Sequence, residues 1–123
     1  MQKILLVEDD VELAELYKIQ FEKAGFEFAY VTNGLQALAN LQDQKPDLIL
    51  LDIMLPGTNG LDVLKKIKEN ETTSDIIVVL LSNLPEESAK DKGLSLGAAD
   101  YLVKSNHTPL EVIEKVQTLL KGA

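Results

Sequence analysis

The sequence has no cysteine and a single histidine in 123 residues. Without cysteine there are no disulfide bonds, thiolate metal sites or cysteine nucleophiles. One histidine without a cysteine partner also argues against a transition-metal centre. That histidine, His107, lies just before a predicted helix cap, where we expect it to face solvent. A chain without cysteine suits the cytoplasm, which is the location that we expect.

Basic clusters and long apolar runs are missing as well. The 12 Lys and Arg residues are outnumbered by 20 Asp and Glu, which gives a net charge of −8. Binding to nucleic-acid phosphates needs clustered Lys and Arg, so we expect no direct nucleic-acid binding by this domain. The longest wholly apolar run, residues 76–81, is far too short to span a bilayer, and we expect no membrane association.

The glycine-rich motifs of nucleotide-binding α/β proteins are also lacking. No G-x-G-x-x-G follows the first apolar run, and G-x-x-x-x-G-K-[ST] does not occur. These absences exclude dinucleotide binding of the nicotinamide type and P-loop nucleotide binding.

The sequence does contain a strict alternation of strand and helix patterns. Short apolar runs predict strands, and apolar residues at helical spacing predict helices. The predicted strands are residues 3–7, 27–31, 47–51, 76–81 and 99–103. The predicted helices are residues 10–24, a segment marked by 35–41 that ends before Pro46, 61–68, 86–96 and 109–120. The run 76–81 is the most hydrophobic, and we expect it at the centre of the sheet.

Residues that start, stop or weaken helices support these limits. Gly25 is a natural helix stop. Thr108 and Glu111, with a proline directly after Thr108, form a capping-box sequence. Gly93 weakens the predicted helix over 86–96.

Five strands alternating with five helices predict right-handed crossovers. The expected fold class is therefore α/β, a doubly wound five-stranded parallel sheet with helices on both faces and the flavodoxin-like strand order 2-1-3-4-5. Linkers, internal repeats and low-complexity segments are absent, so residues 1–123 are predicted to form one domain.

Acidic residues and a lysine follow three of the predicted strands. Glu8, Asp9 and Asp10 follow the first strand, Asp52 the third and Lys104 the fifth. The carboxyl ends of parallel strands meet at one edge of such a sheet, where its ligands bind. Carboxylates brought together repel one another and favour a hard cation with oxygen ligands. The sequence therefore predicts a cation-dependent site for phosphate chemistry.

The order of these groups resembles the receiver domain of two-component response regulators, over essentially all of residues 1–123. That family has an acidic pair after the first strand, a phosphoacceptor aspartate after the third, Ser or Thr after the fourth, and an aromatic residue and a lysine in the fifth. The matching residues are Glu8, Asp9, Asp52, Ser82, Tyr101 and Lys104. The stretches 52–60 and 97–104 also resemble family motifs.

The resemblance implies a phosphorylation-dependent signalling switch, and not an enzyme beyond its own phosphotransfer and slow dephosphorylation. Asp52 would be the nucleophile that accepts a phosphoryl group from the phosphohistidine of a sensor histidine kinase or phosphotransfer protein. Glu8, Asp9, Asp52 and the backbone carbonyl of Met54 would hold Mg²⁺. The other implied partners are a downstream target or output domain and a second copy of the chain, in a homodimer formed on phosphorylation.

Five residues have further roles implied by the resemblance. Lys104 and Ser82 would contact phosphoryl oxygens. Tyr101 would pack inward when Ser82 shifts, and this would change the face formed by the fourth helix, the fifth strand and the fifth helix. Met54 and Leu84 would flank the path of the water that hydrolyses the acyl phosphate. Both are apolar, which predicts a long-lived phosphorylated form.

Simpler interpretations of several residues stay open at this point. Asp10 and Ser82 suit helix caps, Tyr101 an ordinary half-buried aromatic residue, and Lys104 a solvated lysine. Met54 and Leu84 could simply face solvent. For the whole chain, the alternatives are an aspartyl-nucleophile phosphatase and a degenerate receiver that serves only as a scaffold. The phosphatase would need an aspartate at the position of Met54.

Three departures from the common receiver pattern bear on the site. Ser82 replaces the commoner threonine and loses a methyl group. Asn83 stands where the family has a small apolar residue, which predicts different packing behind the site. Ser105 follows Lys104 where many relatives have proline, and this leaves the cis or trans state of that peptide open.

Overall fold

The computed structural model describes residues 1–43 and 45–122, and for residues 86–88 the backbone alone. Residues 44 and 123 of the predicted domain lie outside it. Five parallel strands form one sheet in the order β2-β1-β3-β6-β7. They are β1 (Lys3–Val7), β2 (Glu27–Val31), β3 (Leu48–Leu51), β6 (Ile77–Ser82) and β7 (Asp100–Val103). The predicted flavodoxin-like order is confirmed, but β3 and not the more hydrophobic β6 occupies the centre.

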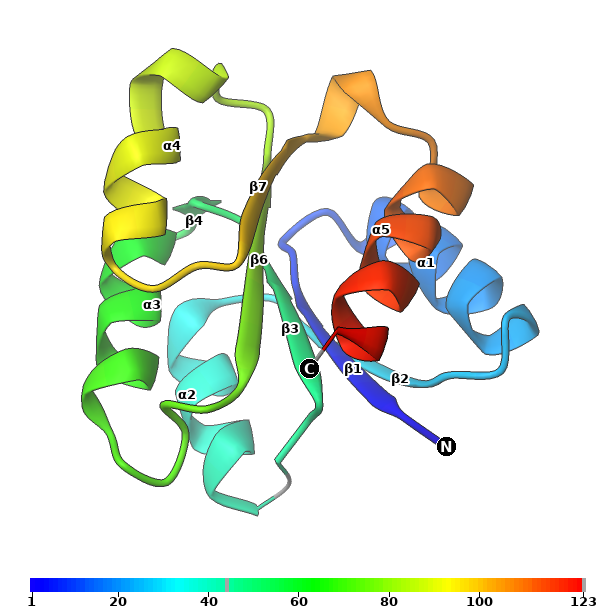
Figure 1. The fold of residues 1–123 in the computed structure, drawn as a ribbon, viewed down its shortest axis with the longest axis horizontal. Coiled ribbons are helices and arrows are strands. Elements are labelled where there is room, and N and C mark those ends of the chain that lie inside the picture. Colours follow the sequence, from blue (N-terminus) through cyan, green and yellow to red (C-terminus); the bar gives the residue numbers. More distant parts are fainter. Residues whose placement is uncertain (44, 123) are drawn as a thin grey trace.

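Helices cover both faces of the sheet, as predicted. They are α1 (Val11–Lys23), α2 (Gly34–Asp43), α3 (Gly60–Glu69), α4 (Glu86–Ser95) and α5 (Pro109–Lys121). Figure 1 shows α2, α3 and α4 on one side of the sheet and α1 and α5 on the other. Among the described residues, no helix combines the length and apolar character needed to cross a membrane.

The helix ends follow their local sequence. Asp10 caps α1, since its side chain accepts the Leu13 N–H at 3.2 Å. Gly25 follows α1 with φ of +93°, a conformation that favours glycine. Thr108 and Glu111 form the predicted reciprocal capping box at the start of α5. These caps fix where the helices begin and end.

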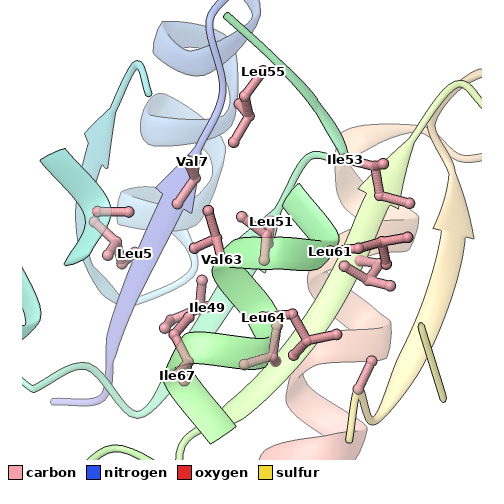
Figure 2. Packing of buried hydrophobic residues seen from close by; sticks show 14 of the residues in the cluster. Leu5, Val7, Ile49, Leu51, Ile53, Leu55, Leu61, Val63, Leu64 and Ile67 are labelled. Carbon is pink, nitrogen blue, oxygen red and sulfur yellow. The ribbon is translucent and has the colours of Figure 1, made fainter. Parts of the chain in front are cut away.

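Two apolar layers form the core, one on each side of the sheet. Successive residues of a strand point to opposite faces, so Leu5 packs beneath α2 and α3 while Leu6 packs beneath α1 and α5. Figure 2 shows the first layer, where Val63 and Leu64 of α3 lie against Leu51 of β3. Burial on both faces explains the unbroken apolar strand sequences. A fully buried leucine stabilises the fold by about 1.5–3 kcal/mol.

The segment after β3 contains a small hairpin that the sequence did not predict. Strands β4 (Met54–Leu55) and β5 (Thr58–Asn59) pair antiparallel, although no strand was predicted between residues 51 and 61. A Pro56–Gly57 turn joins them, with φ of +68° at Gly57. Two-residue strands are too short to show a periodic pattern.

Candidate functional site

The carboxyl ends of the strands bring the predicted site residues to one edge of the sheet. Glu8 follows β1, Asp52 follows β3, Ser82 ends β6 and Lys104 follows β7. The ladder of backbone hydrogen bonds continues past the strand ends. Asp52 N–H donates to the carbonyl oxygen of Val7 at 3.1 Å, and Glu8 N–H to that of Val31 at 3.0 Å. The backbone of both acids is therefore fixed by the sheet.

Gly60, the first residue of α3, fixes the backbone of Asp52 from the other side. A Cβ atom at this position would lie 2.1 Å from the Asp52 carbonyl oxygen and 2.6 Å from the Ile53 Cα. The Gly60 N–H also donates to the Ile53 carbonyl at 2.7 Å. Only glycine permits this approach. The sequence placed Gly60 in the receiver-like stretch 52–60, directly before a predicted helix, but did not predict its contact with the Asp52 backbone.

Lys104 joins two buried carboxylates. Its Nζ donates to Glu8 Oε2 at 2.5 Å and to Asp52 Oδ2 at 2.7 Å. Glu8 is 2% and Asp52 4% exposed, and the lysine side chain is itself 11% exposed. The lysine is thus partly buried and paired, unlike the solvated strand-end lysine considered as an alternative. Removing one partner of such a buried pair leaves an uncompensated charge.

Burial and neighbouring charges shift the protonation of this group. Burial raises the pKa of Glu8 to about 7, against the opposing pull of Lys104, and the nearby Asp52 carboxylate adds to the rise. Burial also opposes the charge on Lys104, but its hydrogen bonds to Asp52 and Glu8 outweigh that effect and raise the lysine pKa. Both raised pKa values mean that the buried carboxylates favour positive charge beside them, as a bound proton or as a cation.

Three carboxylates converge in a manner that could hold a metal ion. Oxygen atoms of Glu8, Asp9 and Asp52 all lie within 4.8 Å of one another. Asp9 is exposed while the other two are buried, so the cluster opens to solvent on one side. Asp10 is outside the cluster and caps α1, as the sequence analysis inferred. Donors that are all oxygen suit a hard cation such as Mg²⁺.

The main chain after Asp52 also contacts its carboxylate. The Met54 N–H donates to Asp52 Oδ1 at 3.1 Å, so both carboxylate oxygens of Asp52 have hydrogen-bond partners. Coordination of a metal by the Met54 carbonyl stays a prediction.

Leu84 lies between the buried hydroxyl and the buried aromatic residue. Its N–H donates to Ser82 Oγ at 3.4 Å, and its carbonyl accepts the Tyr101 hydroxyl at 2.8 Å. Ser82 is 0% and Tyr101 2% exposed. Pro85, and not Ser82, stands at the N-cap of α4. The sequence predicted that Ser82 and Tyr101 act together, but it did not predict that both form hydrogen bonds with the backbone of Leu84.

A groove runs beside the acidic cluster. Asp9, Met54, the β4–β5 hairpin and Leu84 line it. The Met54 side chain is 60% exposed, whereas Leu84 is half-buried and packs against the core. Met54 and Leu84, predicted to flank the approach of water, thus share one surface with Asp9.

Two of the three sequence departures, Asn83 and Ser105, can be compared with the structure. Asn83 is exposed and lines a second groove with Ser105, so it does not pack behind the site. The described residues contain no cis peptide bond, so the Lys104–Ser105 peptide is trans. Residues Lys104–Asn106 form a short 3₁₀ turn. His107, expected to face solvent, is partly exposed.

Comparison with known proteins identifies the family. The family model described as the response regulator receiver domain matches residues 4–117. The chain belongs to the response regulator receiver family. A curated relative, the phosphate regulon transcriptional regulatory protein PhoB of Pseudomonas aeruginosa, is 40% identical over 118 residues, which are 96% of this chain and 51% of that protein. The chain thus spans about half the length of this receiver-containing relative.

Solved receiver structures have the same fold. The receiver domain of the Francisella response regulator 1452 is 30% identical, with a TM-score of 0.89 and coverage of 98% of both chains. The BeF3-activated N-terminal receiver domain of Klebsiella pneumoniae RstA is also 30% identical, with a TM-score of 0.88 over 97% of this chain and 98% of that one. The predicted fold class and family are both confirmed.

Proposed function

We propose that this receiver domain is a switch that accepts a phosphoryl group on Asp52 from a sensor histidine kinase or phosphotransfer protein. The position of Asp52 carries the proposal. It is a buried carboxylate at the end of the central strand, held by Lys104 and by the Met54 N–H, beside the carboxylates of Glu8 and Asp9. A fixed carboxylate next to a cation and a metal-binding cluster suits in-line attack on phosphorus.

The transfer step needs little movement of the acceptor. A carboxylate oxygen of Asp52 attacks the phosphorus of phosphohistidine, the P–N bond breaks, and its electron pair stays on the imidazole of the donor. An acyl phosphate on Asp52 results. Lys104, now bonded to Asp52 and Glu8, would donate to a phosphoryl oxygen, and Ser82 would donate its hydroxyl to another.

The residues around Asp52 fit Mg²⁺. The carboxylates of Glu8, Asp9 and Asp52 and the backbone carbonyl of Met54 would hold it, since all are oxygen donors and the three carboxylates already converge. When bound, the ion supplies positive charge that offsets the negative charge of the phosphoryl oxygens.

We further propose that the signal leaves the site through Leu84. Movement of Ser82 toward the phosphoryl group would pull on the Leu84 backbone, which also accepts the Tyr101 hydroxyl. Tyr101 belongs to β7, so the face made by α4, β7 and α5 would change. That face would then bind a downstream target or output domain, or a second copy in a homodimer.

The wider assignments belong to the same proposal. The protein acts in the cytoplasm, as a signalling domain and not as an enzyme on external substrates. The exposed thioether of Met54 stands where an aspartyl-nucleophile phosphatase would need a second aspartate, and a scaffold would not need the complete charged site. The net charge of −8 supports a domain without its own nucleic-acid surface.

Phosphoryl uptake tests the proposal. Incubation with Mg²⁺ and acetyl phosphate should add one phosphoryl group by intact-mass measurement, and Asp52→Asn should abolish the gain. Asp10→Asn is the matched control, because this residue caps α1 outside the acidic cluster, and it should label like wild type. Equal labelling of Asp52→Asn would refute the assignment. Turnover of a phosphate ester would favour a phosphatase, and no uptake at all a scaffold.

A further inference from the structure

We propose that Met54 is an oxidation site, and that its sulfoxide shortens the lifetime of the phosphorylated state. The proposal rests on the function proposed above. The chain has no cysteine and only two methionines. Met1 is at the amino terminus and is 93% exposed, whereas Met54 is 60% exposed next to the acceptor. Met54 therefore provides the sulfur atom within the folded site.

The backbone fixes Met54 beside Asp52. Its N–H donates to Asp52 Oδ1 at 3.1 Å, and its strand β4 pairs with Asn59 of β5. Its side chain lines one groove together with Asp9 and Leu84. The thioether is accessible to solvent and is also held at the edge of the reaction site. An exposed methionine in a mobile tail would have only the first property.

Oxidation of the Met54 sulfur changes the polarity of the groove that Met54 lines, without a change in the amino-acid sequence. A peroxide transfers one oxygen atom to the sulfur: the thioether loses two electrons and becomes a sulfoxide, and hydrogen peroxide is reduced to water. The product is polar and carries a strong hydrogen-bond acceptor in place of an apolar sulfur. The step is reversible by methionine sulfoxide reductases, which are thiol-dependent enzymes.

The consequence follows from the position of the sulfur. An acyl phosphate on Asp52 is lost when a water attacks phosphorus in line with the Asp52 oxygen. The apolar side chains of Met54 and Leu84 offer that water no hydrogen bond. A sulfoxide oxygen in the same groove can accept one and hold the water. Peroxide would thus convert a long-lived signal into a short-lived one, in a domain whose 123 residues include no cysteine to sense oxidants.

The test compares one protein before and after peroxide. Wild type is treated with hydrogen peroxide, sulfoxide at residues 1 and 54 is mapped by peptide mass, and the protein is loaded with acetyl phosphate and Mg²⁺. Loss of phosphate should accelerate about threefold or more, the scale of one added hydrogen bond. Met54→Leu keeps an apolar side chain without sulfur, so peroxide should not change its rate. Reductase treatment should restore the wild-type rate.

Each failure points to a different step. Full oxidation of Met1 with none at Met54 would show that the thioether is not accessible. Complete Met54 sulfoxide with an unchanged rate would show that this side chain does not govern the water. Equal acceleration in Met54→Leu would assign the effect to other damage. If untreated protein takes up no phosphoryl group, the proposed function fails and the switch fails with it, although the oxidation map still reports the site itself.

Discussion

Lys104 holds together two carboxylates that would otherwise repel each other. The sequence analysis predicted which residues reach this edge of the sheet, because strand ends can be inferred from apolar runs. It did not predict that the lysine bridges Glu8 and Asp52, because side-chain pairing across 96 and 52 residues leaves no local pattern. The positions of the neighbouring acids after β1 did assign Asp9 to the acidic pair and Asp10 to a helix cap, and the structure agrees with both placements. Asp10 is the N-cap of α1, and its side chain accepts a hydrogen bond from the Leu13 N–H, so it lies outside the cluster that contains Asp9.

Substitutions of these two neighbouring acids should have opposite effects on stability. Asp9→Ala should weaken Mg²⁺ binding and raise the melting temperature in EDTA, because one of three converging charges is removed. Asp10→Ala should leave Mg²⁺ binding near wild type but destabilise the fold by about 1 kcal/mol through loss of the cap. Mg²⁺ titration and thermal unfolding in EDTA measure both. A lower melting temperature for Asp9→Ala in EDTA would contradict the repulsion argument.

The lifetime of the phosphorylated form should depend on the two apolar residues beside the acceptor. Met54→Asn and Leu84→Glu each introduce a group that can orient water, and each should speed phosphate loss by roughly tenfold, equivalent to about 1.4 kcal/mol of barrier. Ile19→Asn, an apolar-to-polar change at an exposed position of α1, is the control and should have no effect. Unchanged rates in both site variants would mean that these side chains do not control the approach of water.

At the scale of elements, the five strands of the main sheet, their order and the five helices were predictable, whereas the close side-chain contacts between elements were not. Predicted and observed ends agree closely, because caps such as Thr108 act locally. The hairpin after Asp52 was missed because its strands are two residues long. Gly93 was predicted only to weaken α4, and the structure adds a packing role, because a Cβ there would lie 2.3 Å from Leu80 Cδ1. The close distance between Gly93 of α4 and Leu80 of β6 results from tertiary packing, which the periodic pattern of a helix sequence does not predict.

Gly93→Ala should therefore destabilise the protein although alanine favours helices. The gain in helix propensity is about 1 kcal/mol. Against it stands overpacking of the fully buried Leu80, which costs about 1–3 kcal/mol. We expect a net loss on the order of 1 kcal/mol in urea unfolding, relieved when Leu80→Val is added. A more stable Gly93→Ala protein would show that α4 moves away from the sheet at little cost.

For the whole molecule, the proposed switch requires that phosphorylation at one edge of the sheet changes the face formed by α4, β7 and α5. Ser82, Leu84 and Tyr101 connect the two through hydrogen bonds, and Tyr101 is already packed inward. Phosphorylation would then stabilise the inward position of Tyr101, which the protein also adopts without a phosphoryl group. A coupling of about 1–3 kcal/mol is typical of such links.

Phosphorylation of Asp52 should shift amide NMR signals over α4, β7 and α5, and Tyr101→Phe should reduce those shifts because it removes the hydroxyl bound by Leu84. Tyr30→Phe is the matched control: its hydroxyl bonds Glu15 of α1 instead. Signals on this face that stay unchanged while Asp52 is fully phosphorylated would refute the link.

Lys104 directly follows the last strand, so it is among the last site residues to be synthesised. A growing chain that has emerged only as far as β6 contains Glu8, Asp9 and Asp52 but not the lysine that neutralises two of them. The crowded acids then oppose assembly of the sheet edge, and the acceptor lacks its positively charged partner. If Asp52 is the phosphoacceptor, the site would be complete only once β7 and Lys104 have been made, and chains that stop before β7 would accept the phosphoryl group poorly.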